Sequence, residues 1–124
     1  MIRLEPWSDF AEHALERVEG LGVVDVKREV EEGISQLWHC ADAADGGRGY
    51  VVTRLEQRPS GVEWVFVAGV SVGKSACFYK FIDVFINAAL EAGVPIRAHV
   101  NRRGMVRMYD RIGFRVSEYV LRRP

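Results

Sequence analysis

The stretch that decides the fold is Asn101-Arg-Arg-Gly-Met-Val-Arg-Met-Tyr109-Asp-Arg-Ile-Gly113-Phe114, which follows a short apolar run at residues 94–100. The run predicts a strand, and the methionines and isoleucine of the stretch recur at helical spacing. Gly113 provides the left-handed residue at which helices commonly end. The pattern therefore predicts a strand and then a helix, whose last turn brings the Tyr109 phenol to the edge of a sheet.

Immediately before this stretch, the sequence predicts a second strand and a long helix. Residues 62–72 form an apolar run that alternates too little for a half-exposed strand, so we expect a central strand covered on both faces. Residues 74–92 are helical in pattern and apolar almost all round. One narrow polar stripe is expected to face water, and it consists of Lys80, Asp83, Asn87 and Glu91. A polar residue in every turn argues against a membrane-spanning helix. A helical crossover makes residues 94–100 parallel to the central strand.

The first half of the chain predicts two helices and a meander of strands. Ser8 is a candidate N-cap for a helix through residue 18, and Asp25 for a second helix through residue 32. Strands are expected at 34–41 and 50–55, with turns at 45–47 and 58–61, and a last strand at 115–122.

Composition limits the range of functions. A chain of 124 residues, 48% of them hydrophobic, predicts one domain over residues 1–124 with its own core. Two cysteines without a CxxC pair, and acidic residues near the start, predict a reducing, cytoplasmic setting. The net charge is zero, but residues 1–46 hold 11 acids and 4 bases whereas residues 94–124 hold 2 acids and 8 bases. This asymmetry fits a phosphate or nucleic-acid face, or two halves that pair with each other, and overall neutrality favours the second.

The order of elements and the Tyr109 segment resemble the GNAT superfamily of N-acetyltransferases over nearly the whole chain. This resemblance implies an α/β (α+β) domain with a mixed, mainly antiparallel sheet whose central parallel pair splays apart between flanking helices. It also implies acetyl-coenzyme A as acyl donor, with Tyr109 protonating the departing thiolate. Asn101 occupies the family's asparagine position approximately, one residue too far from Tyr109.

The resemblance also implies a cofactor site along the central strand. The backbone near Val70 and Val72 would pair with the pantetheine arm, and the next helix would offer its first amides to the pyrophosphate. The family loop there usually carries an arginine or glutamine, then a glycine, and then a second glycine or an alanine, whereas this chain has only Gly73, Lys74, Ser75 and Ala76 after the strand. A turn glycine and a helix-capping serine explain the same residues equally well. The spacing of three residues between Gly69 and Gly73 is one short of a nucleotide-binding P-loop.

A general base is needed to deprotonate the amine, and Glu63 and His99 are the candidates, at the start and near the end of their strands. Each also has a structural explanation, as does Tyr109, because aromatic residues on amphipathic helices commonly fill the core. Four residues could in principle bind zinc, but they occupy three separate predicted elements without the close-paired spacing of structural zinc sites, so no metal site is predicted: His39, Cys40, Cys77 and His99.

The sequence therefore predicts an acetyl-CoA-dependent N-acyltransferase with an unidentified amine acceptor. The alternative is a non-catalytic GNAT-like protein, in a bacterium or phage, that binds a protein or nucleic acid through the arginines at 103, 107 and 111, which share one helical face. The shortened loop favours this alternative. A homodimer is compatible with either function, and no membrane association is predicted.

Overall fold

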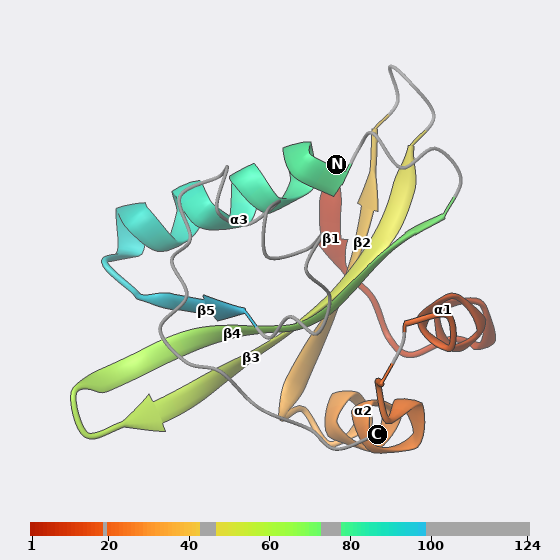
Figure 1. The fold of residues 1–124 in the computed structure, drawn as a ribbon, viewed down its shortest axis with the longest axis horizontal. Coiled ribbons are helices and arrows are strands. Elements are labelled where there is room, and N and C mark those ends of the chain that lie inside the picture. Colours follow the sequence, from red (N-terminus) through yellow and green to blue (C-terminus); the bar gives the residue numbers. More distant parts are fainter. Residues whose placement is uncertain (19, 43–46, 73–77, 99–124) are drawn as a thin grey trace.

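The computed structural model describes residues 1–18, 20–42, 47–72 and 78–98. Within this part a five-stranded sheet separates α3 on one face from α1 and α2 on the other (Figure 1). The strands are β1 (Ile2–Leu4), β2 (Ser35–Ala41), β3 (Arg48–Arg58), β4 (Gly61–Val72) and β5 (Ile96–Ala98), and the helices are α1 (Asp9–Leu15), α2 (Val23–Glu31) and α3 (Phe78–Ala92).

The sheet has the predicted mixed topology. The strands lie in chain order, β1 to β4 pair antiparallel, and β5 lies parallel to β4. The antiparallel pairs need only short turns, whereas the parallel pair requires the long crossover that α3 provides. The predicted fold class is thus confirmed.

The two N-terminal helices differ in how well their starts were predicted. The Ser8 side chain accepts a hydrogen bond from the Ala11 N–H at 3.1 Å and caps α1, as expected. The prediction that Asp25 caps α2 was wrong, because the helix begins at Val23 after Gly22. Asp25 instead lies in the first turn, where a carboxylate also interacts favourably with the positive end of the helix dipole.

The edge strand β1 was not predicted from the sequence. It has three residues, and it pairs with β2 through the register Ile2 opposite Cys40 and Leu4 opposite Trp38. A run this short carries no recognisable alternation. Its identity as a strand comes from the neighbour that it pairs with.

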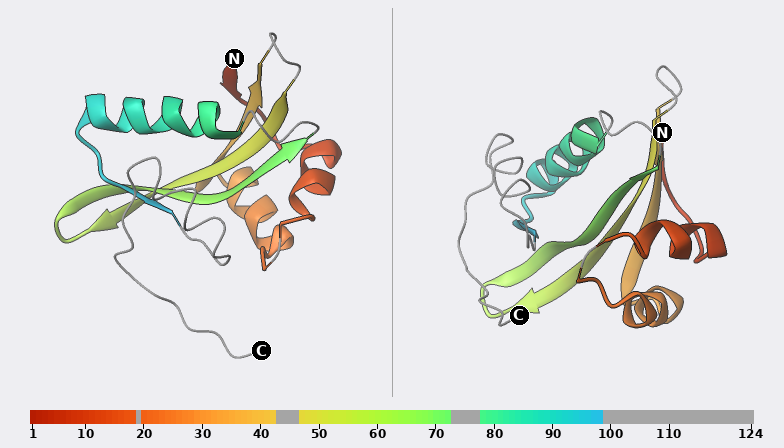
Figure 2. Two further views of the ribbon diagram at one scale, coloured as in Figure 1. Left: turned by 45° about the horizontal axis from the view of Figure 1, so that its top comes forward. Right: turned by 45° about the vertical axis from the view of Figure 1, so that its right-hand side comes forward.

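Both faces of β4 are covered, as predicted for the central strand. Towards α3 the core consists of Cys40, Val51, Phe66, Phe81, Ile82 and Phe85, and towards α1 and α2 it consists of Ala11, Ala14, Leu15, Val26, Leu37, Tyr50 and Val52. The two further views in Figure 2 show the helices on opposite sides of the strongly twisted sheet.

The exposed face of α3 is wider than the narrow polar stripe expected. Asp83 and Asn87 are exposed as predicted, but Val84 and Leu90 are also exposed, by 53% and 74%. Gly93, with a φ of 70°, ends the helix as expected. No helix in the described ranges is both long and apolar enough to cross a membrane.

Several predicted elements lie outside the described residues. These are most of the turn at 45–47, the start of the helix predicted from residue 74, the end of the strand predicted to residue 100, and everything from residue 101 onwards, including the Tyr109 helix and the last strand.

Candidate cofactor site

The feature of the sheet that could accept a ligand is the change in pairing along β4. Its first half pairs with β5 through Trp64, Val65 and Phe66, and the partner of Phe66 is Ala98, the last residue of the chain that the structure describes. Its second half, residues 67–72, continues to pair with β3 as far as Val72. Among the described residues, no strand pairs with the other edge of this second half (Figure 1). We call it the free edge.

A β-bulge lies at the boundary between the two halves. Val52 pairs with Ala68 and Thr53 with Phe66, so Val67 has no residue opposite it on β3. A bulge bends its strand and increases the local twist. The extra residue therefore changes the course of β4 immediately after its last pair with β5, at the point where the two strands were predicted to splay.

The geometry shows which backbone groups face the free edge. A Cβ placed on Gly49 of β3 would lie 2.7 Å from the Val70 carbonyl oxygen, so this oxygen points towards β3. Successive carbonyl groups of a strand point to opposite edges. The groups that point to the free edge are therefore those of Gly69 and Ser71.

The sequence analysis expected the backbone near Val70 and Val72 to pair with the cofactor, whereas the groups that point to the free edge belong to the neighbouring residues Gly69 and Ser71. The Val70 and Val72 side chains pack against the core under α1 and α2, and their backbone groups are directed towards β3. The sequence could not show which residues direct their backbone groups to the free edge, because both faces of β4 carry apolar side chains and the sequence therefore does not alternate.

One side chain reaches the free edge from α1. The Arg17 guanidinium, just beyond the end of that helix, donates a hydrogen bond through Nη2 to the Ser71 carbonyl oxygen. This contact independently agrees with the outward direction of the Ser71 carbonyl. Sequence analysis did not identify Arg17, which lies among acidic residues with no motif around it.

Next to the free edge, a cluster of ionisable side chains lies on the α1 face of β2 and β3. His39 is buried, and its Nδ1 lies 3.2 Å from the Glu5 carboxylate while its Nε2 lies 3.4 Å from Arg48 Nε. Arginine can only donate, so Nε2 accepts and Nδ1 carries the proton that points at Glu5. The cluster fixes one tautomer of His39.

Tyr50 completes this cluster. Its ring lies 5.2 Å from that of His39, and Phe10 of α1 lies 6.2 Å away on the other side. Burial, and then the nearby Glu5 carboxylate, raise the pKa of the Tyr50 phenol, although Arg48 acts in the opposite direction. The phenol is thus held neutral, and the cluster fastens α1 to the sheet beside the free edge.

Glu63, one of the two predicted bases, lies in the other half of β4. Its carboxylate is 3.0 Å from Arg97 Nε on β5 and 3.8 Å from Arg58 Nε on β3. The Arg97 N–H does not point at the nearer oxygen, so this close ion pair contains no hydrogen bond between the two buried atoms. Glu63 therefore belongs to a group of ion-paired side chains that connects β3, β4 and β5.

That group of charges extends to α2. Glu56 accepts hydrogen bonds from Arg54 at 2.7 Å and from Arg97, and Arg54 also donates to Glu29 at 2.7 Å. Hydrogen bonds to these two carboxylates raise the Arg54 pKa despite the opposing effect of burial, so the guanidinium stays charged. The first half of β4 is therefore tied to its neighbours by ion pairs as well as by the backbone.

The remaining predicted site residues lie outside the described part of the chain. They are Gly73, Lys74, Ser75, Ala76, His99, Asn101 and Tyr109. Cys40, considered as a zinc ligand, is buried under α3, and burial raises the pKa of its thiol from 9.0 to about 12. A thiol that resists ionisation is a poor metal ligand.

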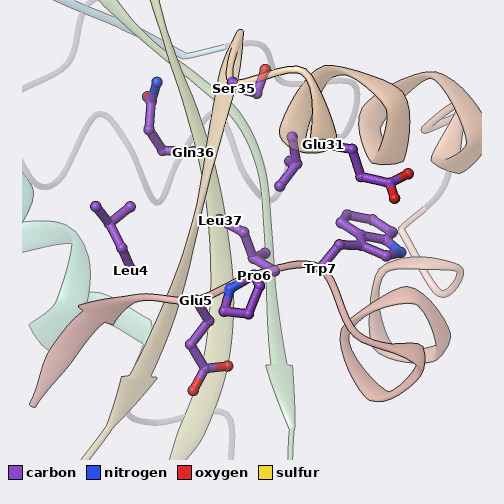
Figure 3. A pocket seen from close by; sticks show the side chains of 10 residues that line it. Leu4, Glu5, Pro6, Trp7, Glu31, Ser35, Gln36 and Leu37 are labelled. Carbon is purple, nitrogen blue, oxygen red and sulfur yellow. The ribbon is translucent and has the colours of Figure 1, made fainter.

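A surface hollow of about 470 Å³ lies elsewhere, between β1, β2 and α2 (Figure 3). Leu4 and Gln36 line it on one side of β2, whereas Trp7 and Glu31 line it on the other. Its polar groups do not converge on a common point. The hollow is therefore a weaker candidate than the free edge.

Comparison with known proteins supports the same fold. No family model and no curated protein matches the sequence. Among solved structures, a probable acetyltransferase superposes with a TM-score of 0.70 at 12% identity, over 100% of this chain and 98% of the other. The ribosomal-protein-alanine N-acetyltransferase of Brucella melitensis biovar Abortus superposes with a TM-score of 0.68 at 16% identity, over 98% and 99%.

A third similar structure is a predicted acetyltransferase from Clostridium acetobutylicum, solved with acetyl-CoA. It superposes with a TM-score of 0.64 at 10% identity and covers 100% of this chain and 96% of that one. These likenesses extend over the full length of both chains. They show that this chain has the fold of GNAT-type acetyltransferases.

Proposed function

We propose that this protein is an acetyl-CoA-dependent N-acyltransferase that transfers the acyl group directly to an amine. The observation that carries the proposal is the free edge of β4, which begins at a bulge and along which no described strand pairs with residues 67–72. Its outward groups, the N–H and C=O of Gly69 and the N–H of Ser71, can hydrogen-bond an extended amide chain as a further strand would, while the Ser71 carbonyl already accepts from Arg17. The pantetheine arm of coenzyme A is such a chain.

The proposed reaction forms one bond and breaks one. The amine nitrogen attacks the thioester carbon, an amide bond forms, and the carbon–sulfur bond breaks. Tyr109 gives its proton to the departing thiolate, for which a phenol of ordinary pKa near 10 is suitable. A base takes the proton from the amine. Because both reactants are held in one site, orientation provides much of the rate.

Of the two candidate bases, the charges around Glu63 favour His99. Glu63 is engaged by two arginines in the half of β4 that is paired on both edges. In the sequence, His99 follows directly on Ala98, the last residue of β5. Gly73, Lys74, Ser75 and Ala76 are proposed to contact the cofactor phosphates, and Asn101 to contribute to the same site.

Titration calorimetry with acetyl-CoA tests whether the cofactor binds. At a concentration one hundred times the dissociation constant, the cofactor should stabilise the protein by about 2.7 kcal/mol, which a thermal melt also detects. ATP is the control for binding of an adenine nucleotide alone. If acetyl-CoA produces no heat and no shift of the melting temperature, the enzyme is excluded and a non-catalytic GNAT-like protein remains.

The role of Tyr109 is tested separately by Tyr109→Phe. Release of free thiol from acetyl-CoA, followed with a panel of primary amines, should fall by about a hundredfold or more while calorimetric affinity stays the same. Tyr119→Phe is the matched control in the same C-terminal part of the sequence. Unchanged turnover in Tyr109→Phe would remove the general acid from the mechanism.

A further inference from the structure

Arg17 differs from the other arginines of the described chain in what it contacts. Five of them lie within 4 Å of a carboxylate: Arg3, Arg28, Arg54, Arg58 and Arg97. Arg48 contacts His39 and the face of Phe10. For Arg17, the partner among the described residues is the neutral Ser71 carbonyl at the free edge. Within the part of the chain that the structure describes, no carboxylate therefore lies within 4 Å of the Arg17 guanidinium.

The hydrogen bond to Ser71 also gives this charge a fixed place. A guanidinium has five N–H donors in a planar fork, and the bond to Ser71 uses a donor on Nη2. The Arg17 side chain is exposed, so its remaining donors are accessible to a ligand. Such a fork is suited to two oxygens of one phosphate or carboxylate group.

The position of Ser71 along β4 indicates which part of a coenzyme A thioester would meet Arg17. In the proposed function, the residues that follow Val72 contact the cofactor phosphates, so the thioester lies towards the Phe66 end of the free edge. Ser71 lies roughly 16 Å from Phe66 at the strand rise of about 3.3 Å per residue. Val72 is the last residue of β4. The far end of the pantetheine arm, where the diphosphate is attached, therefore comes to the end of the strand that Arg17 reaches from α1.

We propose that Arg17 binds the diphosphate of the acyl-coenzyme A, so that a cation from the N-terminal helical layer compensates for the absence of arginine from the short segment between β4 and α3. This inference rests on the proposed function. It assigns to α1 a part in cofactor binding, in addition to its packing against the sheet.

Calorimetry with two donors, acetyl-CoA and S-acetylpantetheine, tests the proposal, because only acetyl-CoA carries the diphosphate. Arg17→Gln should weaken acetyl-CoA binding by about tenfold and leave S-acetylpantetheine unchanged, since one charge-assisted contact is worth about that factor. Arg17→Lys, which keeps the charge but not the fork, should lie between. Arg28→Gln, which removes an exposed arginine from α2, should change neither affinity.

The outcomes separate this proposal from the proposed function. Equal affinity of the wild type and Arg17→Gln for acetyl-CoA would overturn the role of Arg17 and leave the enzyme in place. Tighter binding by Arg17→Gln would also overturn it, because Arg17 would then obstruct the free edge. Absence of binding in the wild type and all variants would reject both. Thermal melts without ligand show whether each variant is folded. If Arg17→Gln does not fold, the affinity of Arg17→Lys for acetyl-CoA decides whether Arg17 binds the diphosphate.

Discussion

The two halves of β4 form a contrast within a single strand. In residues 61–66 the strand has a hydrogen-bonded neighbour on each edge over Trp64 to Phe66, and Val65 and Phe66 are buried. In residues 67–72 its one neighbour among the described strands is β3, and none of these six residues is fully buried. A single extra residue, Val67, separates the halves.

This difference shows how a small domain can combine a stable core with an open site. Hydrogen-bonding groups at a strand edge that lack a partner invite pairing with another chain or ligand. Here the first half is fixed by core packing and ion pairs, and these hold the free edge in position. Substitutions in the first half should therefore affect the stability of the fold, whereas those in the second half should affect the site.

The largest effect is expected from Phe66→Ala at the end of the first half. The Phe66 ring is 4% exposed and packs edge-on against Trp64 and Phe85, with ring centres 5.7 and 5.6 Å apart. Its removal should cost about 3–5 kcal/mol of the free energy of unfolding, measured by denaturant titration. Leu55→Ala, at a position 58% exposed on β3, is the control and should cost far less. A loss below 1 kcal/mol for Phe66→Ala would show that the half is not closely packed.

Breaking the charged group of the first half should have a smaller effect. Arg97→Met keeps the length of the side chain but leaves the carboxylates of Glu56 and Glu63 without their shared guanidinium. We expect a loss of about 2–3 kcal/mol, below the value for a fully buried pair. Arg28→Met removes an exposed pair with Asp25 and should cost less than 0.5 kcal/mol. Equal losses in the two variants would mean that the group contributes no more than a surface pair.

Opposite the second half of β4, Gly49→Ala on β3 tests the contact that fixes the orientation of the free edge. The new methyl group would lie 2.7 Å from the Val70 carbonyl oxygen, so β3 and β4 must separate locally at a cost of about 1–2 kcal/mol. The affinity for acetyl-CoA should also fall under conditions where the variant is fully folded, so that the loss of folding stability does not account for it. Gly22→Ala is the control, because its methyl group would meet only the flexible Asp25 side chain at 3.3 Å. If Gly49→Ala binds acetyl-CoA with unchanged affinity, the orientation of the free edge does not matter for cofactor binding.

The smallest effect concerns Cys40 in the core under α3. Since burial raises its pKa from 9.0 to about 12, the unfolded thiol ionises first as the pH rises. The contribution of this group to stability is complete below pH 9 and decreases towards pH 12. Denaturant unfolding at pH 8 and pH 9.5 should show a larger decrease in the free energy of unfolding in the wild type than in Cys40→Ala, by less than about 1 kcal/mol. The same decrease in both would show that the thiol ionises freely in the folded protein.

The order of strands and helices could be predicted because each longer element carries its own pattern. The eleven and twelve residues of β3 and β4, and the fifteen of α3, contain enough apolar periodicity to be identified. Ser8 and Gly93 were predicted for the same reason, since capping chemistry is local. The three-residue β1 and the first turn of α2 had no such local signal.

The site was less accessible from sequence because its geometry depends on register. Whether Val70 or Ser71 points its carbonyl to the free edge depends on how β4 aligns with β3 and on the bulge at Val67. The contact of Arg17 with Ser71 joins residues that are 54 positions apart and belong to no common motif. A pairing of His39 with Tyr50 could have been found, since both lie in predicted strands of one hairpin.

The most direct test of the free edge as the cofactor site is an amide NMR titration of the ¹⁵N-labelled protein with acetyl-CoA. The account predicts the largest shifts at the Gly69 and Ser71 amides, whose groups point to the free edge, and small shifts at Val65 in the half paired on both edges. Saturable shifts confined to the first half of β4 or to the hollow near Trp7, with Gly69 and Ser71 unchanged, would contradict it.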